Sequence, residues 1–85
     1  MTPDNIEKYV EETSRKNSII NVSFKERNVL TGIFVRGTDY DELKKKNFWR
    51  IVSIANLDNW NATKNINLSK LYNGISFTKL SDSKS

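Results

Sequence analysis

Residues 21–52 read NVSFKERNVLTGIFVRGTDYDELKKKNFWRIV, and this stretch decides the fold. On both sides of the charged tetrad 25–28, apolar and polar residues alternate, which is the pattern of two half-buried β-strands joined by a turn. A charged loop with a helical turn is expected over residues 37–47, and residues 48–57 then alternate again with large side chains on both faces. This order predicts a small, strongly bent β-barrel with residues 48–57 as its central strand.

Gly32 stands in the middle of the second predicted strand, residues 29–36. Glycine weakens the interior of a strand, and it is found there where the chain bends sharply or where another backbone approaches closely. We therefore expect Gly32 at a corner of the barrel.

The N-terminal segment is predicted to be a helix over residues 3–15, because Thr2 is a favourable N-cap and Pro3 suits the first helical position. Its apolar stripe follows the helical spacing i, i+3, i+4, i+7 and consists of Ile6, Tyr9, Val10 and Thr13. The opposite face is acidic rather than rich in lysine. The stripe is therefore expected to pack on the sheet and not on a membrane.

Turn residues divide the C-terminal half. The pair Asp58-Asn59 predicts a hairpin from the central strand into a fourth strand over residues 60–64. The pair Asn73-Gly74 predicts a tight turn, after a helical turn over residues 68–72.

The last strand is expected over residues 75–80, with Ile75 and Phe77 facing inward. The fold class is thus mainly β: an N-terminal helix followed by a strongly bent five-stranded SH3-like barrel over about residues 18–80. Residues 1–80 form one domain, and residues 81–85 form a polar tail. The core of so short a chain is small, and oligomerisation would supplement it.

The composition argues against an enzyme. The chain has no cysteine and no histidine, which removes thiolate chemistry and the commonest general base and zinc ligand. Its three glycines are isolated, so no glycine-rich phosphate loop is present. We expect no catalytic residues, no metal, no cofactor and no small-molecule substrate. The chain lacks an apolar run of membrane-spanning length, and we expect a cytoplasmic protein.

Charge is unevenly distributed along the chain. The net charge is +4, with −2 on residues 1–42 and +6 on residues 43–85. Such a division can attract phosphate, or it can bring the acidic part of one subunit to the basic part of another. Ordinary solvated lysines are the alternative.

The most specific candidate for nucleic-acid contact is the segment from Lys44, Lys45 and Lys46 to Arg50, whose cations can neutralise phosphates. The aromatic residues within it can stack on bases, and Tyr40 is a second stacking candidate. In the alternative interpretation these aromatic residues belong to the core and the lysines keep a loop solvated.

Two further groups have both a functional and a structural interpretation. Trp60 and Tyr72 can form an aromatic cage for a cation or peptide, or they can fill the barrel or an oligomer interface. The acidic run Asp39, Asp41 and Glu42 suggests a cation site, but it lacks the spacing of a calcium loop, which favours a solvated loop.

The order of these segments resembles the Sm and Sm-like (Lsm) proteins of RNA metabolism. In the first motif of that family, an alternating strand, a glycine-containing strand, an aspartate and an asparagine follow one another. The matching residues here are Gly32, Asp39 and, after a longer loop than the family usually has, Asn47. In the second motif an Arg-Gly pair precedes an apolar strand, and here Asn73-Gly74 takes that place.

The resemblance implies a ring whose central pore binds single-stranded RNA, with Asp39, Asn47, Asn73 and Gly74 near the base pocket. An asparagine replaces the arginine of the second motif, and Lys70 is a candidate to supply the missing charge. A partly open five-stranded barrel also leaves two strand edges unpaired, and head-to-tail pairing of copies would cover them in a cyclic homo-oligomer. The alternative function is a protein-binding or assembly module that binds no nucleic acid.

Overall fold

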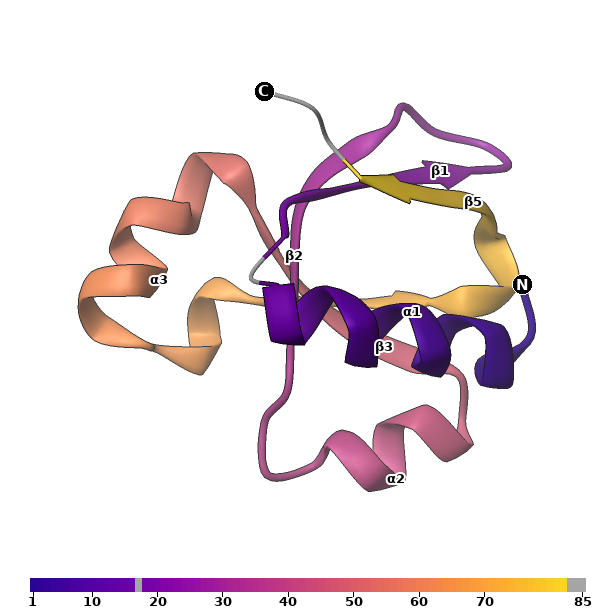
Figure 1. Ribbon diagram of the computed structural model, residues 1–85, viewed down its shortest axis with the longest axis horizontal. Coiled ribbons are helices and arrows are strands. Elements are labelled where there is room, and N and C mark those ends of the chain that lie inside the picture. Colours follow the sequence, from indigo (N-terminus) through magenta and orange to yellow (C-terminus); the bar gives the residue numbers. More distant parts are fainter. Residues whose placement is uncertain (17, 83–85) are drawn as a thin grey trace.

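The computed structural model describes residues 1–16 and 18–82 (Figure 1). Within them, helix α1 precedes a five-stranded antiparallel sheet, and two further helices lie between strands. The elements are α1 (Pro3–Lys16), β1 (Ile20–Phe24), β2 (Leu30–Val35), α2 (Tyr40–Lys45), β3 (Phe48–Ser53), α3 (Leu57–Thr63), β4 (Lys70–Asn73) and β5 (Phe77–Asp82). Three short 3-10 helices complete them: η1 (Ile54–Asn56), η2 (Ile66–Leu68) and η3 (Gly74–Ser76).

The strands lie in the order β4-β3-β2-β1-β5, so β4 and β5 form the two edges of the sheet. The sheet is strongly curved, as the contact between Phe24 of β1 and Tyr72 of β4 shows. These strands are three places apart, roughly 14 Å in a flat sheet, yet the two ring centroids are 5.6 Å apart. Figure 1 shows β1 and β5 facing β3 across the molecule, with β2 running between them. In the described residues no β4–β5 ladder closes the sheet into a complete barrel.

Gly32 lies where β2 crosses β3, paired with Ser53. A Cβ atom built on Gly32 would lie 2.1 Å from the carbonyl oxygen of Val52, a distance that no side chain can occupy. Of the two explanations for a glycine inside this strand, the close approach of another backbone is therefore confirmed.

Aromatic rings fill the space that the curved sheet encloses. Phe34 of β2 lies between Trp49 of β3, at 6.4 Å, and Phe77 of β5, at 6.5 Å between ring centroids. Phe24 continues the row to Phe77 at 5.3 Å. This aromatic row joins strands from both sides of the sheet, so the core depends on the curvature.

Helix α1 packs on this core through the predicted stripe. Ile6 and Val10 are fully buried in the same cluster as the aromatic row. The Tyr9 hydroxyl donates a hydrogen bond of 2.8 Å to Asp82 of β5, and burial, followed by this carboxylate, raises the pKa of Tyr9. The helix ends one residue beyond its predicted end, and its predicted packing on the sheet is confirmed.

The prediction of a long central strand and a following hairpin was wrong beyond Ser53. Residues 54–63 are helical, and residues 57–63 form α3 where a turn and the fourth strand were expected. Asp58 is compatible with a turn, but a carboxylate is also favourable in the first turn of a helix, where it lies here. The prediction that this segment is not an edge strand is confirmed, since β3 lies between β2 and β4 in the sheet.

The fourth strand is Lys70–Asn73, so the helical turn predicted for residues 68–72 was also wrong. Asn73 and Gly74 lead into the 3-10 turn η3 rather than directly into a strand, because the Asn73 side chain accepts a hydrogen bond from the Ile75 backbone. Phe77 is buried as expected, but Ile75 is 61% exposed and does not face inward.

The polar tail was predicted to begin at residue 81. Strand β5 instead continues to Asp82, because Asp82 pairs with Ile20 of β1. Residues 83–85 lie outside the described residues. Helices account for 42% of the chain, so the fold is mixed α and β rather than mainly β.

Replacing Gly32 by alanine should destabilise the protein by about 3 kcal/mol or more, because the new methyl group would overlap backbone that has no other place to go. Urea unfolding followed by circular dichroism measures the change. Gly37→Ala is the matched control, since its nearest neighbours would be side-chain atoms at 3.1 and 3.4 Å, and its expected cost is below about 1 kcal/mol. Equal effects of the two substitutions would contradict this account of the curvature.

Candidate nucleic-acid interface

Three of the predicted site residues meet where the β2–β3 and β4–β5 connections approach each other. The backbone N–H of Gly74 donates a hydrogen bond of 2.8 Å to the carbonyl oxygen of Asn47. Asn73 pairs with Phe48, the residue after Asn47, at the end of the β3–β4 ladder. We call Asn47, Asn73 and Gly74 the loop junction. Residues 26 or more positions apart in the sequence are thus brought together.

Asn47 is a buried residue with a φ angle of 63°, a left-handed conformation that asparagine tolerates better than most residues. Its side-chain oxygen accepts a hydrogen bond of 2.8 Å from the Trp49 indole N–H. Its side-chain nitrogen donates to the carbonyl oxygen of Met1 at 3.4 Å. Both ends of the Asn47 amide therefore already have partners inside the protein.

Gly74 leaves no room for a side chain at the loop junction. A Cβ atom there would lie 2.3 Å from Oδ1 of Asn47 and 2.5 Å from Cδ1 of Ile6. Helix α1 and the two connections are thus packed against one another at this point. Asn73 is exposed, and Lys70 lies three residues earlier on β4, where it pairs with Ile51 rather than joining the junction.

The three lysines of the candidate segment differ in their surroundings. Lys44 forms an ion pair of 2.6 Å with Glu7 of α1 and a longer one of 3.5 Å with Asp41. The hydrogen bond to Glu7 is the main cause that raises the pKa of Lys44. Lys45 and Lys46 are exposed and directly precede Asn47. The cationic surface beside the loop junction therefore consists of Lys45 and Lys46, while Lys44 joins α2 to α1.

Asp39 lies at the other end of α2 from the loop junction and has a structural partner. Its carboxylate accepts hydrogen bonds from Arg50 of β3, at 2.6 Å from Nη2 and 3.2 Å from Nε. This two-point contact holds the pKa of Asp39 below its ordinary value of 3.8. Arg50 also donates to the Ser69 hydroxyl at 3.3 Å. Asp39 thus fixes α2 to the sheet rather than lying with Asn47.

The candidate stacking residues of this region pack inside the protein. Trp49 is only 2% exposed. Tyr40 packs on it with ring centroids 6.0 Å apart, and the buried Tyr40 hydroxyl has no hydrogen-bond partner among the described residues. Burial, followed by the charge of Glu7, raises the pKa of Tyr40. Trp49 is thus closed to a base, and the half-buried Tyr40 ring lies against Trp49 and beside the cations of Arg36, at 5.9 Å, and Lys44, at 5.4 Å.

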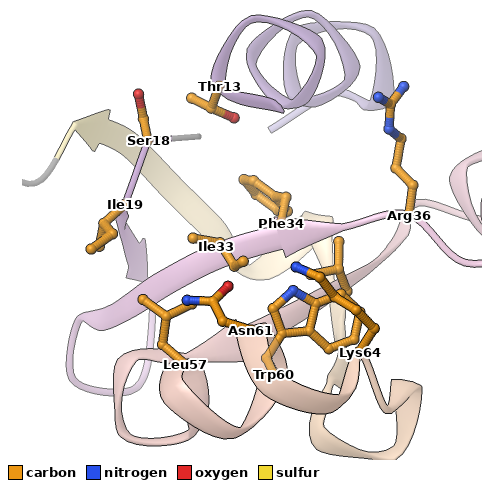
Figure 2. Close-up of a pocket in the computed structure, with 11 residues that line it drawn as sticks. Thr13, Ser18, Ile19, Ile33, Phe34, Arg36, Leu57, Trp60, Asn61 and Lys64 are labelled. Carbon is orange, nitrogen blue, oxygen red and sulfur yellow. The ribbon is translucent and has the colours of Figure 1, made fainter. Parts of the chain in front are cut away.

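Trp60 and Tyr72 line different pockets, so the structure does not bring them together in one aromatic cage. Tyr72 packs on Phe24, with Arg27 over its ring at 5.5 Å. Trp60 lines a pocket on the opposite side, between α3 and β2 (Figure 2). The sequence prediction missed both this pocket and the helix that borders it, although Leu57, Trp60, Asn61 and Lys64 follow the spacing i, i+3, i+4, i+7 that indicates one face of a helix.

The acidic run on α2 is not arranged as a cation site. Asp39 pairs with Arg50, and Asp41 pairs with Lys44. Over residues 1–16 and 18–82, no three carboxylates are grouped so that they could hold a metal ion. Among the helices of the same part of the chain, none has the length and apolar character needed to cross a membrane.

Comparison with known proteins gives no further guide, since no family model, no curated protein and no solved structure matches this chain. The assignment of the site therefore depends on the geometry described above.

The contact between Asp39 and Arg50 should make stability depend on pH in a predictable direction. Because the pKa of Asp39 is lowered in the folded protein, the contact stabilises above the ordinary carboxyl pKa, and this stabilisation is lost as the pH falls through the folded value. The free energy of unfolding of the wild type should exceed that of Asp39→Asn at about pH 7, and the difference should shrink towards zero at about pH 2.

Urea titrations across this pH range give the measurement. In an Arg50→Gln background the same substitution at Asp39 should change stability little at any pH, because its partner is absent. A difference that stays constant from neutral to acidic pH would show that Asp39 acts by some means other than this ion pair.

Proposed function

We propose that this chain is a ring-forming Sm-like subunit that binds single-stranded RNA. The observation that carries the proposal is the strand order, in which one strongly curved sheet behind an N-terminal helix has β4 at one edge and β5 at the other. A sheet with its fourth and fifth strands at the two edges permits the head-to-tail pairing of copies that a ring of the Sm-like kind requires. Edge strands expose unpaired N–H and C=O groups, and pairing β4 of one copy with β5 of the next satisfies both edges.

The side chains at the β4 edge support assembly. Leu71 of β4 is 47% exposed and Ile75 of η3 is 61% exposed, and both are large apolar residues. They line a shallow groove together with Tyr72 and Arg27. Exposed apolar groups beside a free strand edge are characteristic of a surface that another chain covers. A second copy that adds its β5 to β4 would bury both side chains.

The charge beside the loop junction supports RNA as the ligand. Lys45 and Lys46 are exposed at the end of α2, and the exposed Asn73 lies across the junction from them. Ammonium groups neutralise phosphates without regard to base sequence, and an amide can hydrogen-bond a base edge. A ring would repeat this group once in each subunit. A single strand could then contact several copies in succession.

The second candidate function is an assembly module that binds no nucleic acid. The observation in its favour is that the Asn47 side-chain amide already hydrogen-bonds to Trp49 and Met1, so neither of its ends is available to a base. With Asn73 in place of the arginine of the family, the base pocket that the resemblance implies has lost two of its groups. Assembly through β4 and β5 does not depend on that pocket.

Removing the exposed apolar side chains at the β4 edge should weaken assembly without unfolding the subunit. The wild type is expected to sediment as an oligomer of its 9.9 kDa chain at micromolar concentration, and the double variant Leu71→Ser, Ile75→Ser as a monomer. Ile54→Ser is the matched control, because Ile54 is 54% exposed but lies in η1, away from β4. A wild type that sediments only as a monomer would refute the ring.

Neutralising Lys45 and Lys46 tests the RNA interface. The double variant Lys45→Gln, Lys46→Gln should bind a short oligouridine more weakly. The slope of log affinity against log salt should become shallower by about 1.4 for each subunit that the strand contacts, the value for two lost phosphate contacts on a single strand. Lys8→Gln on the exposed face of α1 should leave affinity and slope unchanged. Fluorescence anisotropy at two or more salt concentrations measures both quantities. Failure of the wild type to bind RNA, with assembly intact, would favour the assembly module.

A further inference from the structure

A second surface with the chemistry of a ligand site lies on the side of the molecule formed by α3. Figure 2 shows a pocket between the last turns of α1, residues 18 and 19 before β1, strand β2 and α3, and its volume is about 520 Å³. Ligand sites commonly have volumes of this size. We call this the α3 pocket.

Helix α3 presents one face to the α3 pocket. Leu57, Trp60, Asn61 and Lys64 lie along that face, as Figure 2 shows, and Ile33 of β2 lies opposite Leu57 and Asn61. None of the residues of α3 is buried, so the helix does not use this face to complete the core. An amphipathic helix that leaves an indole and an amide beside a pocket is available for a ligand.

Two cations line the α3 pocket together with the indole, Lys64 over the Trp60 ring and Arg36 with its guanidinium 5.9 Å from the centroid of the Tyr40 ring. The Lys64 ammonium lies 5.4 Å from the centroid of the Trp60 ring. Lys64 ends the helix in a left-handed conformation with φ 53°, and its backbone N–H donates to the Trp60 carbonyl oxygen at 2.7 Å, which fixes its backbone beside the ring while its side chain is exposed. Arg36, at the end of β2, is exposed and also lines the α3 pocket.

A neighbouring depression shares Arg36, Trp60 and Lys64 with the α3 pocket, so these three residues border both. The other charged residues of that depression are Arg50 and Asp39, which neutralise each other. The unneutralised charge around the indole is therefore positive. This surface attracts an anion that carries a flat ring, because one group stacks and the others pair with negative charge.

We propose that the α3 pocket binds a nucleotide unit of single-stranded RNA, with the base stacked on Trp60 and the adjacent phosphates paired with Lys64 and Arg36. The inference rests on the proposed RNA-binding function and adds a site to it. An entering base takes the place of the Lys64 ammonium over the ring, and the displaced ammonium then turns to a phosphate. The Asn61 amide and the Ser18 hydroxyl on the pocket wall supply hydrogen bonds to a base edge or a ribose.

The α3 pocket and the loop junction lie at opposite ends of the molecule. In Figure 1, α3 lies at the left, while the N-terminus and the turn between β4 and β5 lie at the right, along the longest extent of 32 Å. Helix α3 interrupts the β3–β4 connection, which the sequence prediction had assigned to a simple hairpin. The two sites are therefore separable by mutation.

The two tryptophans make the α3 pocket directly measurable. Trp49 is buried, whereas Trp60 borders the pocket, so a base that stacks on the protein surface changes the emission of Trp60 alone. An oligouridine of about ten nucleotides, within the usual range of single-strand site sizes, is the probe. We expect it to quench the fluorescence of the wild type and to leave that of Trp60→Phe unchanged.

Affinity is measured in parallel by anisotropy of the labelled oligonucleotide. Trp60→Ala should bind about tenfold more weakly, since one stacked base is lost. Lys64→Gln, which keeps the indole, should bind more weakly and with a shallower salt dependence, and Lys8→Gln is the control for loss of an exposed lysine outside the pocket. Circular dichroism and urea unfolding establish that each variant is folded.

The outcomes separate this inference from the proposed function. Quenching that disappears in Trp60→Phe, together with weaker binding by Trp60→Ala and Lys64→Gln, supports the α3 pocket, whether or not Lys45 and Lys46 also contribute. Binding that depends on Lys45 and Lys46 but is unaffected by the changes at Trp60 and Lys64 overturns the α3 pocket and leaves the proposed function standing. Absence of RNA binding in every assay overturns both.

Discussion

The structure depends on one close contact, the approach of the Gly32 backbone to the carbonyl oxygen of Val52. With no side chain between them, β2 can cross β3 closely enough for the sheet to curl. The curl brings β1 and β5 opposite β3 and encloses the aromatic row from Phe24 to Trp49. Within the described residues, the sheet stays open, so the outer edges of β4 and β5 are unpaired. The core therefore depends on the curvature, and the candidate assembly surface on the strand order.

Local patterns predicted the first half of the fold well. The sequence predicted the α1 stripe and the two strands around the charged turn, because each has a clear hydrophobic period. It also predicted that Gly32 has a structural role, because few physical reasons place a glycine inside a strand. The second half was predicted less well. Alternation continues past Ser53 although the strand ends there, and Leu57, Trp60 and Lys64 also fit a helix. Strand β4 has four largely exposed residues, and so short an exposed edge carries almost no periodic signal.

The candidate site was predictable in part for a related reason. The meeting of Asn47 with Asn73 and Gly74 followed from the order of the motifs, as the resemblance implied. The partners of individual side chains did not follow. Asp39 bonds to Arg50, Lys44 to Glu7, and Asn47 to Trp49, and the choice of partner depends on how the helices lie on the sheet. Such contacts between separate elements produce no pattern in the neighbouring sequence, so they cannot be predicted from it. They determine which side chains remain available to a ligand.

The central claim is that copies of this chain pair through the outer edges of β4 and β5. The measurement that tests it most directly is hydrogen exchange of these two strands as a function of protein concentration. If copies pair through β4 and β5, the backbone amides of these strands should be protected at high concentration and should exchange faster on dilution, while β2 and β3 stay protected throughout. Exchange of β4 and β5 that is equally fast at every concentration would contradict the account, because the edges would then remain unpaired.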